Sequence, residues 1–313
     1  MDRAEKAPTY VIGKRPAELD TEDIDLTPVR TYWQLVRTRF VRHRMALISL
    51  FVLLALLIFA IVVPLLTGNE YTHAQLKTIG APASLSAPLG YDEIGQNVFL
   101  RLAKATQTSL IIGGAAVTII VVVGVLVGSI AGYVGGAVDN VLMRFVDVVL
   151  SLPVLFIILM IVSFFGTGNV TVVVIAIGIT GWTLAARLIR AEFLSLREAD
   201  FVQAARALGA SHLRIVLRHI LPSAMAPLIV AAALGVADSV VTEAALSFLG
   251  FGISRPDVSL GNMLNNAQDY FVRQPFLVLP PGIILVLIVL SASFFGDGLR
   301  DALDPRQRIE ASE

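Results

Sequence analysis

Long apolar blocks restrict the fold of this sequence more than any other feature. Residues 45–66 carry no charged side chain, and neither do residues 148–186. About 20 consecutive helical residues cross the hydrocarbon core of a bilayer. Inside that core every backbone polar group must be bonded within the protein, so only helices or closed barrels cross it. The blocks are longer than barrel strands and do not alternate, so we predict an all-α integral membrane protein.

The composition supports a lipid-facing surface, because 56% of the residues are hydrophobic and 15% are charged. A soluble domain of 313 residues needs far less apolar surface to fill its core. We expect about six transmembrane helices. They lie at residues 45–66, 109–134, 148–186, 221–242 and 276–295, where the turn at residues 165–169 divides the third block into two spans.

These spans divide the chain into five parts. They are a tail at residues 1–30, an interfacial helix with the first span at 31–66, an external loop at 67–104, a core of five spans at 105–300, and a tail at 301–313. The core contains a polar loop at residues 198–219, between its third and fourth spans. Fifteen lysine or arginine residues lie on the side of this loop and five on the opposite side. The positive-inside rule therefore predicts that the loop and both termini are cytoplasmic.

The polar loop has the pattern of two short helices. Asp200 is predicted to cap the first helix, with Gln203 completing a capping box. Gly209 ends this helix, and a second one is expected from Ser211 up to Pro222. One apolar side of the first helix is formed by Phe201, Ala204, Ala205 and Leu208. The pattern alone also fits an amphipathic helix that lies on the membrane surface.

Two further features bear on function. Gly124, Gly128, Gly132 and Gly136 recur every four residues, which indicates close packing against a neighbouring helix or a hinge. Ionisable groups at membrane depth are costly, so Asp238 and Glu243 are candidates for lining a translocation path, with a structural hydrogen bond as the alternative for each.

Enzymatic and metal chemistry are not expected in this chain. The sequence has no cysteine, and the histidines at positions 43, 73, 212 and 219 lack the spacing of metal ligands. No GxxxxGK[ST] phosphate-binding motif is present, because Gly13-Lys14 lacks the upstream glycine and is followed by Arg15. Any ATP hydrolysis linked to this chain must then occur on a separate subunit.

The segment QAARALGASHLRIVLRHILP, residues 203–222, resembles the EAA loop of the membrane subunits of ABC importers. The matching residues are Gln203, Ala204, Ala205, Gly209, Leu221 and Pro222, and Gln203 replaces the usual glutamate. This resemblance implies that the loop, from Phe201 through Leu208 and on to Pro222, docks to an ATPase subunit. It also implies the type I ABC importer permease fold.

Other segments resemble the dipeptide, oligopeptide and nickel permeases within this group. They lie at residues 87–102, 144–153, 243–264 and 296–305, and the N-terminal region is similar to the second permease subunit of the pair. Departures are Gln96-Asn97, where Arg-Asp is common, and Leu260, where an aromatic residue is common. The resemblance implies an import permease of a bacterial or archaeal inner membrane that carries di- or oligopeptides, nickel or another small solute.

The resemblance also implies the partners: a homologous permease, two cytosolic ABC ATPase subunits that bind ATP and magnesium, an external solute-binding protein and membrane lipid, without nucleic acid. No cofactor or metal is expected in the chain itself. A proton-coupled secondary transporter and a structural or assembly membrane protein are the two alternative classes. A proton-coupled secondary transporter normally has repeats and charged, broken helices at the midplane. A structural or assembly membrane protein would leave the EAA-like segment unexplained.

Overall fold

Helices form nearly all of the regular structure in the computed structural model, which describes residues 32–270, 272 and 274–303. The predicted tails therefore lie outside the described residues, except for residues 301–303, which end the last helix. The long helices are α2 (Arg44–Thr67), α3 (Val98–Val134), α6 (Val170–Leu196), α9 (Leu221–Phe248) and α11 (Leu279–Leu303). Shorter helices are α1 (Tyr32–Arg42), α4 (Gly136–Ser151), α5 (Val154–Phe165), α7 (Asp200–Ala207), α8 (His212–Ile215) and α10 (Leu260–Asn266).

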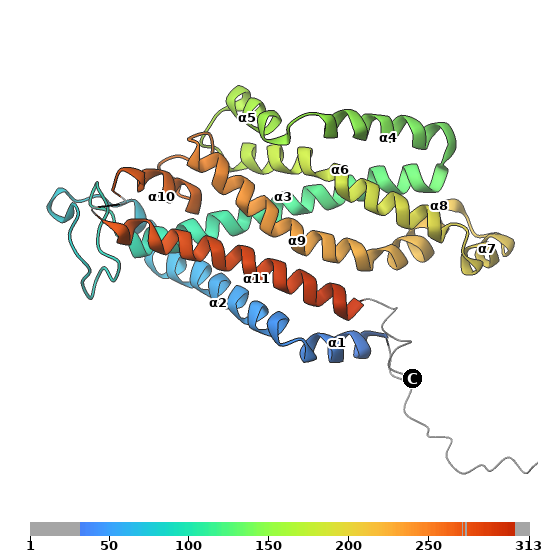
Figure 1. Ribbon diagram of the computed structural model, residues 1–313, viewed down its shortest axis with the longest axis horizontal. Helices are drawn as coiled ribbons and strands as arrows, with labels where there is room; N and C mark the ends of the chain where they lie inside the picture. Colours follow the sequence, from blue (N-terminus) through green and yellow to red (C-terminus); the bar gives the residue numbers. More distant parts are fainter. Residues whose placement is uncertain (1–31, 271, 273, 304–313) are drawn as a thin grey trace, which may run out of the picture.

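The long helices run side by side in an elongated bundle (Figure 1). Helices α2 and α11 pack together on one side, α3 and α9 lie in the middle, and α6 packs on α3 and α9. Helices α4 and α5 cover the far side of α6. One end of the bundle carries α1, α7 and α8, and the other carries α10 and the segment at residues 68–97. We call them the α7 end and the α10 end.

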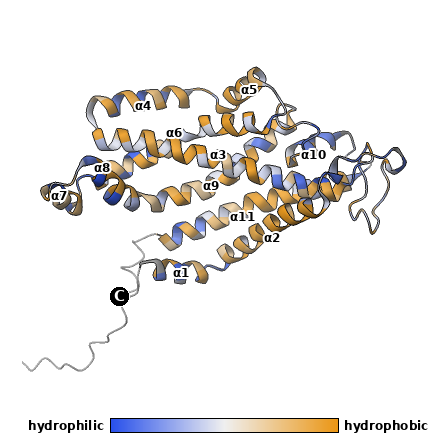
Figure 2. Ribbon diagram, turned by 180° about the vertical axis from the view of Figure 1, so that it is seen from behind, coloured by the Kyte–Doolittle hydropathy of each residue, from blue (hydrophilic) through white to orange (hydrophobic). Residues whose placement is uncertain are grey.

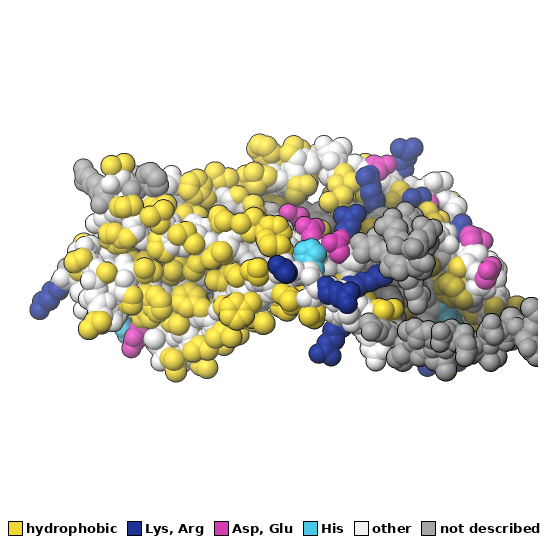
Figure 3. Space-filling view, turned by 60° about the horizontal axis from the view of Figure 1, so that its bottom comes forward, with side chains coloured by type: hydrophobic (Ala, Val, Ile, Leu, Met, Phe, Trp, Pro, Cys, Tyr) yellow, Lys and Arg dark blue, Asp and Glu magenta, His cyan; other side chains and the backbone are white. Residues whose placement is uncertain are grey.

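Five of these helices are long and apolar enough to cross a membrane, and the broken pair α4 and α5 brings the number to six if it counts as one span. The helices are hydrophobic along most of their length, whereas polar residues gather at the two ends (Figure 2). One side of the bundle shows a broad hydrophobic area with charged side chains gathered mainly toward one end (Figure 3). The predicted all-α membrane fold is confirmed for the described part of the chain.

The third predicted span, from residue 148 to the turn at 165–169, is not one straight helix. It contains the end of α4 and all of α5, and these two helices meet at an angle of 84°. Pro153 explains the break, because proline disfavours helical geometry in the residue before it, and Leu152 is extended with φ −91° and ψ 141°. Helix α4 is held along α6 by two ion pairs, Asp139 with Arg190, and Asp147 with Arg187 at 2.5 Å.

The glycine pattern in α3 allows a close contact with α6. A Cβ atom on Gly124, Gly128 or Gly132 would lie 2.4–2.6 Å from atoms of α6. The close-packing interpretation is therefore confirmed for these three residues. Gly136 is different, since it starts α4 with a positive φ of 57° and has no heavy atom near its missing Cβ.

Helix α1 is joined to the bundle at the α7 end. His43 lies between α1 and α2, and its Nδ1 accepts a hydrogen bond from the Ala46 amide at 3.1 Å. Its other ring nitrogen lies 3.6 Å from a carboxylate oxygen of Asp301 in α11. Phe40 packs edge-on against Phe295, also in α11, with ring centroids 5.7 Å apart. These contacts fix the first span against the last.

Candidate functional site

Helix α7 begins one residue earlier than the sequence pattern predicts. Ala199 occupies the extended cap position and makes no side-chain capping bond, so Asp200 lies in the first helical turn. There its charge is favourable near the positive end of the helix dipole. Gln203 bonds instead to the carbonyl oxygen of Arg197, at 3.5 Å. The predicted capping box is therefore wrong, although the helix is present.

The apolar side chains of α7 do not all point the same way. Val202 is fully buried and Ala205 is half-buried, and both pack on the core formed with Ile215 of α8. Leu208 is 89% exposed, and Phe201 is 44% exposed. The predicted apolar side is thus divided: Phe201 and Leu208 face outward, while Ala205 also supports the fold of the segment. Gln203 and Ala204 are exposed as well.

A tight turn joins α7 to α8. Gly209 has a φ of +80°, a conformation that glycine adopts without steric cost. The Ala210 amide bonds back to the Ala205 carbonyl oxygen at 3.1 Å, which closes the end of α7. No heavy atom lies within 4 Å of a Cβ built on Gly209, so the positive φ, and not lack of space, explains glycine here.

The sequence predicts a second short helix that ends at Pro222, but the structure has no helix end there. Helix α8 is followed directly by η3 (Val216–Ile220), a π-helical turn, and then by α9. Together they form one apolar helix from His212 to Phe248. Pro222 follows the π-helical turn directly, at the start of α9, and as a proline it donates no backbone hydrogen bond to that turn. The α7–α8 segment is therefore connected to the core of the bundle by a continuous helix.

Helices α6 and α9 border a cleft in the middle of the bundle. It has a volume of about 460 Å³, and most of its lining is aliphatic. Ser239 and three threonines, Thr180, Thr183 and Thr242, also border it. Asp238 is the one ionisable side chain in the lining. It is exposed, and its carboxylate makes no ion pair or hydrogen bond with the described residues.

A second cavity of about 740 Å³ continues from this cleft toward the α7 end. The two share Leu188, Ala231 and Leu234 in their linings. Pro222, at the start of α9, borders the second cavity, as do the charged residues Glu192 and Arg300. The exposed inner surface of α9 thus runs from the α7–α8 segment up to Asp238 and Thr242.

Glu243 does not border the cleft, although the sequence placed it with Asp238. Its side chain is fully buried between α3, α9 and α10. Ser109 donates to its Oε2 at 2.9 Å, and Ser247 donates to its Oε1 at 2.7 Å. Because both oxygens are bonded inside the chain, the geometry supports the structural alternative for Glu243. Ser247 lies one turn further along α9, but Ser109 is 134 positions away, so the contact between α3 and Glu243 has no direct signal in the sequence.

The serines of this cluster also hold the segment that follows α9. Ser109 accepts from the Leu260 amide at 3.3 Å, and Ser247 accepts from the Ile253 amide at 2.9 Å. Ser259 donates to Ser247 at 3.1 Å. The hydroxyls of Ser109 and Ser247 therefore each accept from the segment after α9 and donate to the carboxylate, which fixes residues 252–262 against α3 and α9.

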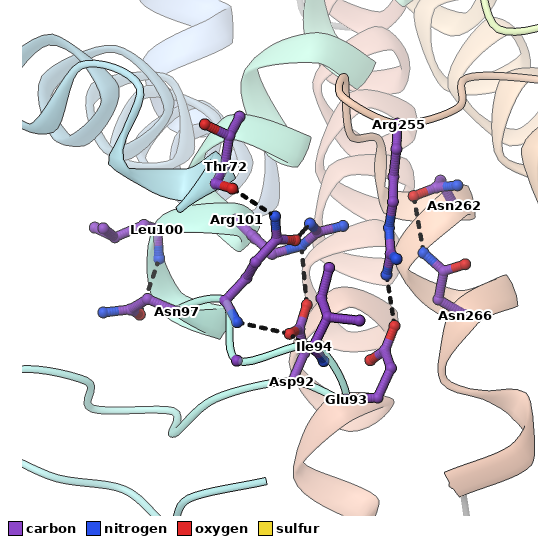
Figure 4. Close-up of polar contacts among 12 residues, drawn as sticks. Thr72, Asp92, Glu93, Ile94, Asn97, Leu100, Arg101, Arg255, Asn262 and Asn266 are labelled. Carbon is purple, nitrogen blue, oxygen red and sulfur yellow. Dashed lines mark hydrogen bonds and ion pairs between the residues drawn. The ribbon is translucent and has the colours of Figure 1, made fainter. Parts of the chain in front are cut away.

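A second buried polar cluster lies at the α10 end, where the segment at residues 68–97 meets α3 (Figure 4). Arg101 of α3 is 3% exposed, and its Nε lies 3.5 Å from Oδ2 of Asp92. Gln96 accepts from the same guanidinium group and donates to the Thr72 carbonyl oxygen at 2.9 Å. Burial raises the pKa of Asp92, against the opposing effects of the Gln96 amide and Arg101.

The sequence singled out Gln96 and Asn97 only as departures from a family pattern. Asn97 caps α3, since its Oδ1 accepts from the Phe99 amide at 3.0 Å. Nearby, Arg255 forms an ion pair of 2.6 Å with Glu93 (Figure 4). These contacts attach the segment after α9 to the segment before α3. Within the described ranges, no group of three or more His, Asp or Glu side chains is arranged to hold a metal ion.

Comparison with known proteins adds independent information. The profile of the family described as binding-protein-dependent transport system inner membrane component matches residues 124–309. A second profile, described as the N-terminal TM domain of oligopeptide transport permease C, matches residues 31–88.

Full-length relatives are similar over most of the chain. The oligopeptide transport system permease protein OppC of Mycobacterium tuberculosis is 38% identical over 88% of this chain and 94% of its own length. The protein of the same name in Escherichia coli is 37% identical, over 89% of this chain and 93% of its own length. The dipeptide transport system permease protein DppC of Alkalihalophilus pseudofirmus is 34% identical, with coverages of 88% and 90%.

The fold also has a counterpart among solved structures. A chain of the MetNI methionine ABC transporter, in an inward-facing conformation, superimposes with a TM-score of 0.54 at 18% identity. The match covers 65% of this chain and 96% of that chain. At this identity the similarity concerns the fold alone.

Proposed function

This chain belongs to the family of inner membrane components of binding-protein-dependent transport systems, and from that premise we propose that it is a permease subunit of an ATP-driven importer of di- or oligopeptides. The relatives named for oligopeptide or dipeptide transport support this substrate class over nickel or another small solute. We propose further that the chain forms the translocation path together with a homologous permease.

The connection between α7 and the cleft is the observation that carries this proposal. Phe201 and Leu208 are exposed beyond the end of the bundle, where they are available to a partner. The segment continues as one helix, His212–Phe248, whose surface borders both cavities. A displacement of α7 by a partner therefore reaches the wall of the cleft through a continuous helix. This is the geometry required if ATP-driven movement is to open and close a path.

The partners follow from the same arrangement. Two separate ABC ATPase subunits bind ATP and magnesium, and one of them receives α7 of this chain. An external solute-binding protein delivers the peptide at the α10 end. The α7 end then lies in the cytoplasm, in agreement with the excess of arginine on that side, and both termini are cytoplasmic. Asp238 lies on the path, and Glu243 supports its outer wall from behind.

Reconstitution tests this function. The chain is purified with its homologous permease and ATPase subunits, inserted into liposomes, and supplied with the cognate binding protein and radiolabelled trialanine. We expect uptake that requires ATP and the binding protein. Uptake driven by a proton gradient without ATP would contradict the importer mechanism. ATP-dependent uptake of nickel in place of peptides would contradict the substrate class alone.

A further inference from the structure

Asp238 is an isolated carboxylate in a largely aliphatic cleft. Its neighbours on α9 do not neutralise it, and Thr242, one helical turn away, donates to the backbone oxygen of Asp238 at 2.7 Å. Thr180 on α6 likewise donates to a backbone oxygen of its own helix, that of Ala176 at 2.8 Å. The hydroxyl protons of both threonines are thus already engaged. The described part of the chain offers no cation to Asp238.

The contrast with Glu243 shows what is unusual about Asp238. Both are carboxylates in the same half of α9, and both lie at a depth where an unpaired charge is costly. Glu243 is fully buried and receives two hydroxyl donors. Asp238 is exposed to the cleft and receives none. The fold satisfies one carboxylate and leaves the other available.

We propose that Asp238 binds the positively charged group of the solute during passage, namely the α-ammonium group of a peptide. This inference rests on the proposed function and adds to it the residue that recognises the charge. An ammonium group complements an unpaired carboxylate in a cleft of low polarity, where a charge-assisted hydrogen bond is stronger than in water. Among the described residues, Asp238 is the one carboxylate that lines the cleft and no basic residue lines it, because Arg300 borders only the second cavity.

The first test measures the charge of the cleft without using transport. The chain contains no cysteine, so Thr242→Cys gives a single reactive thiol one turn from Asp238 on the same side of α9. In the assembled importer, this thiol is treated with a cationic methanethiosulfonate (trimethylammonium-ethyl) or an anionic one (sulfonatoethyl). We expect the cationic reagent to react faster, and Asp238→Asn to lower the ratio of the two rates by about tenfold.

Controls make this measurement specific. Leu85→Cys at the α10 end provides a fully exposed thiol in the external segment, and its rate ratio should not respond to Asp238→Asn. Asp238→Glu keeps the charge and should keep a high ratio at Thr242→Cys. The proposal would be overturned if Asp238→Asn left the rate ratio unchanged, because Asp238 would then be paired with the homologous permease. It would also be overturned if neither reagent reached the thiol, because the cleft beside Asp238 would then be covered by that subunit.

The second test concerns the solute. With trialanine as the probe and saturating binding protein, Asp238→Asn should lower the uptake rate about tenfold, and Asp238→Glu should restore most of it. Unchanged uptake in Asp238→Asn would overturn the proposal. If the wild-type importer carries no peptide at all, the proposed function fails instead, and the thiol measurement still decides whether Asp238 presents a free charge to the cleft.

Discussion

Ser109 donates a hydrogen bond of 2.9 Å to Glu243 across 134 positions of the sequence, and this bond joins α3 to α9 inside the bundle. It also places the carboxylate out of reach of the cleft, because the second oxygen is bonded to Ser247. A buried carboxylate with both oxygens bonded maintains the packing of the helices around it. The parts of α3 and α9 at the α10 end and residues 252–262 are therefore held as one unit.

Replacing Glu243 should affect stability before transport. Glu243→Leu leaves the buried hydroxyl groups of Ser109 and Ser247 without their acceptor, at about 1–3 kcal/mol for each unsatisfied group. Glu243→Gln keeps one acceptor and should cost less. Thermal unfolding followed by size-exclusion chromatography in detergent measures both. Asp238→Asn is the matched control and should leave the melting temperature unchanged. A melting temperature of Glu243→Leu equal to the wild type would contradict the structural role.

Gly128 should tolerate no side chain. A Cβ atom there would lie 2.4 Å from the Ala186 carbonyl oxygen, and backbone atoms of a packed helix do not move aside easily. Gly128→Val should force α3 and α6 apart, at about 1–3 kcal/mol or more, and lower both the yield and the melting temperature. Gly114→Ala is the control in the same helix, because no heavy atom lies within 4 Å of its missing Cβ. Equal behaviour of the two variants would refute the close contact.

Asp92, in the segment at residues 68–97, should make the stability of the folded protein depend on pH. Burial raises its pKa above the ordinary value of 3.8, so the folded chain binds the proton more tightly than the unfolded chain does. The stability from this difference is fully present below the unfolded pKa and is lost as the pH rises through the folded pKa. Relative to Asp92→Asn, the wild type should therefore gain melting temperature as the pH falls from 7 toward 4. A constant difference between the two proteins would contradict the raised pKa.

The orientation in the membrane can be tested with two leucines. Leu85 is fully exposed at the α10 end, and Leu208 is 89% exposed at the α7 end. Leu85→Cys should react with an impermeant maleimide in intact cells, and Leu208→Cys only after permeabilisation. Ser259 is unsuitable as an external reporter because it is fully buried. The reverse labelling pattern would show that the α7 end lies outside.

Features encoded in adjacent residues were predictable from the sequence. Residues 45–66 match α2 within one residue at each end, and the spacing of Gly124, Gly128 and Gly132 correctly indicated a close contact. Pro153 carried a usable signal for the bend after α4, since it restricts Leu152. The bond between Ser109 and Glu243 had no such signal, because it exists only after distant helices pack. The capping box failed because Ala199 can occupy the cap position without a side-chain bond.

The last prediction concerns α7 as the contact with the ATPase. Leu208 is almost fully exposed and makes no structural contribution that a charge would disturb. Leu208→Glu should therefore insert and fold normally but bury a carboxylate in the docking contact, where an unpaired charge is strongly unfavourable. We expect loss of co-purifying ATPase, or ATP hydrolysis without peptide uptake. Leu85→Glu adds the same charge at an exposed leucine of the opposite end, and the ATPase should co-purify with this variant as it does with the wild type.

Two further variants separate docking from folding within the segment. Gly209→Val should strain the turn by about 1–2 kcal/mol, because φ is +80° there, and it should change the position of α7 without touching its exposed surface. Ala205→Arg should instead disturb the packing on Val202 and Ile215, so it should lower the melting temperature as well as coupling. If Leu208→Glu binds the ATPase and drives uptake at the wild-type rate, α7 does not transmit the movement and the coupling assignment fails.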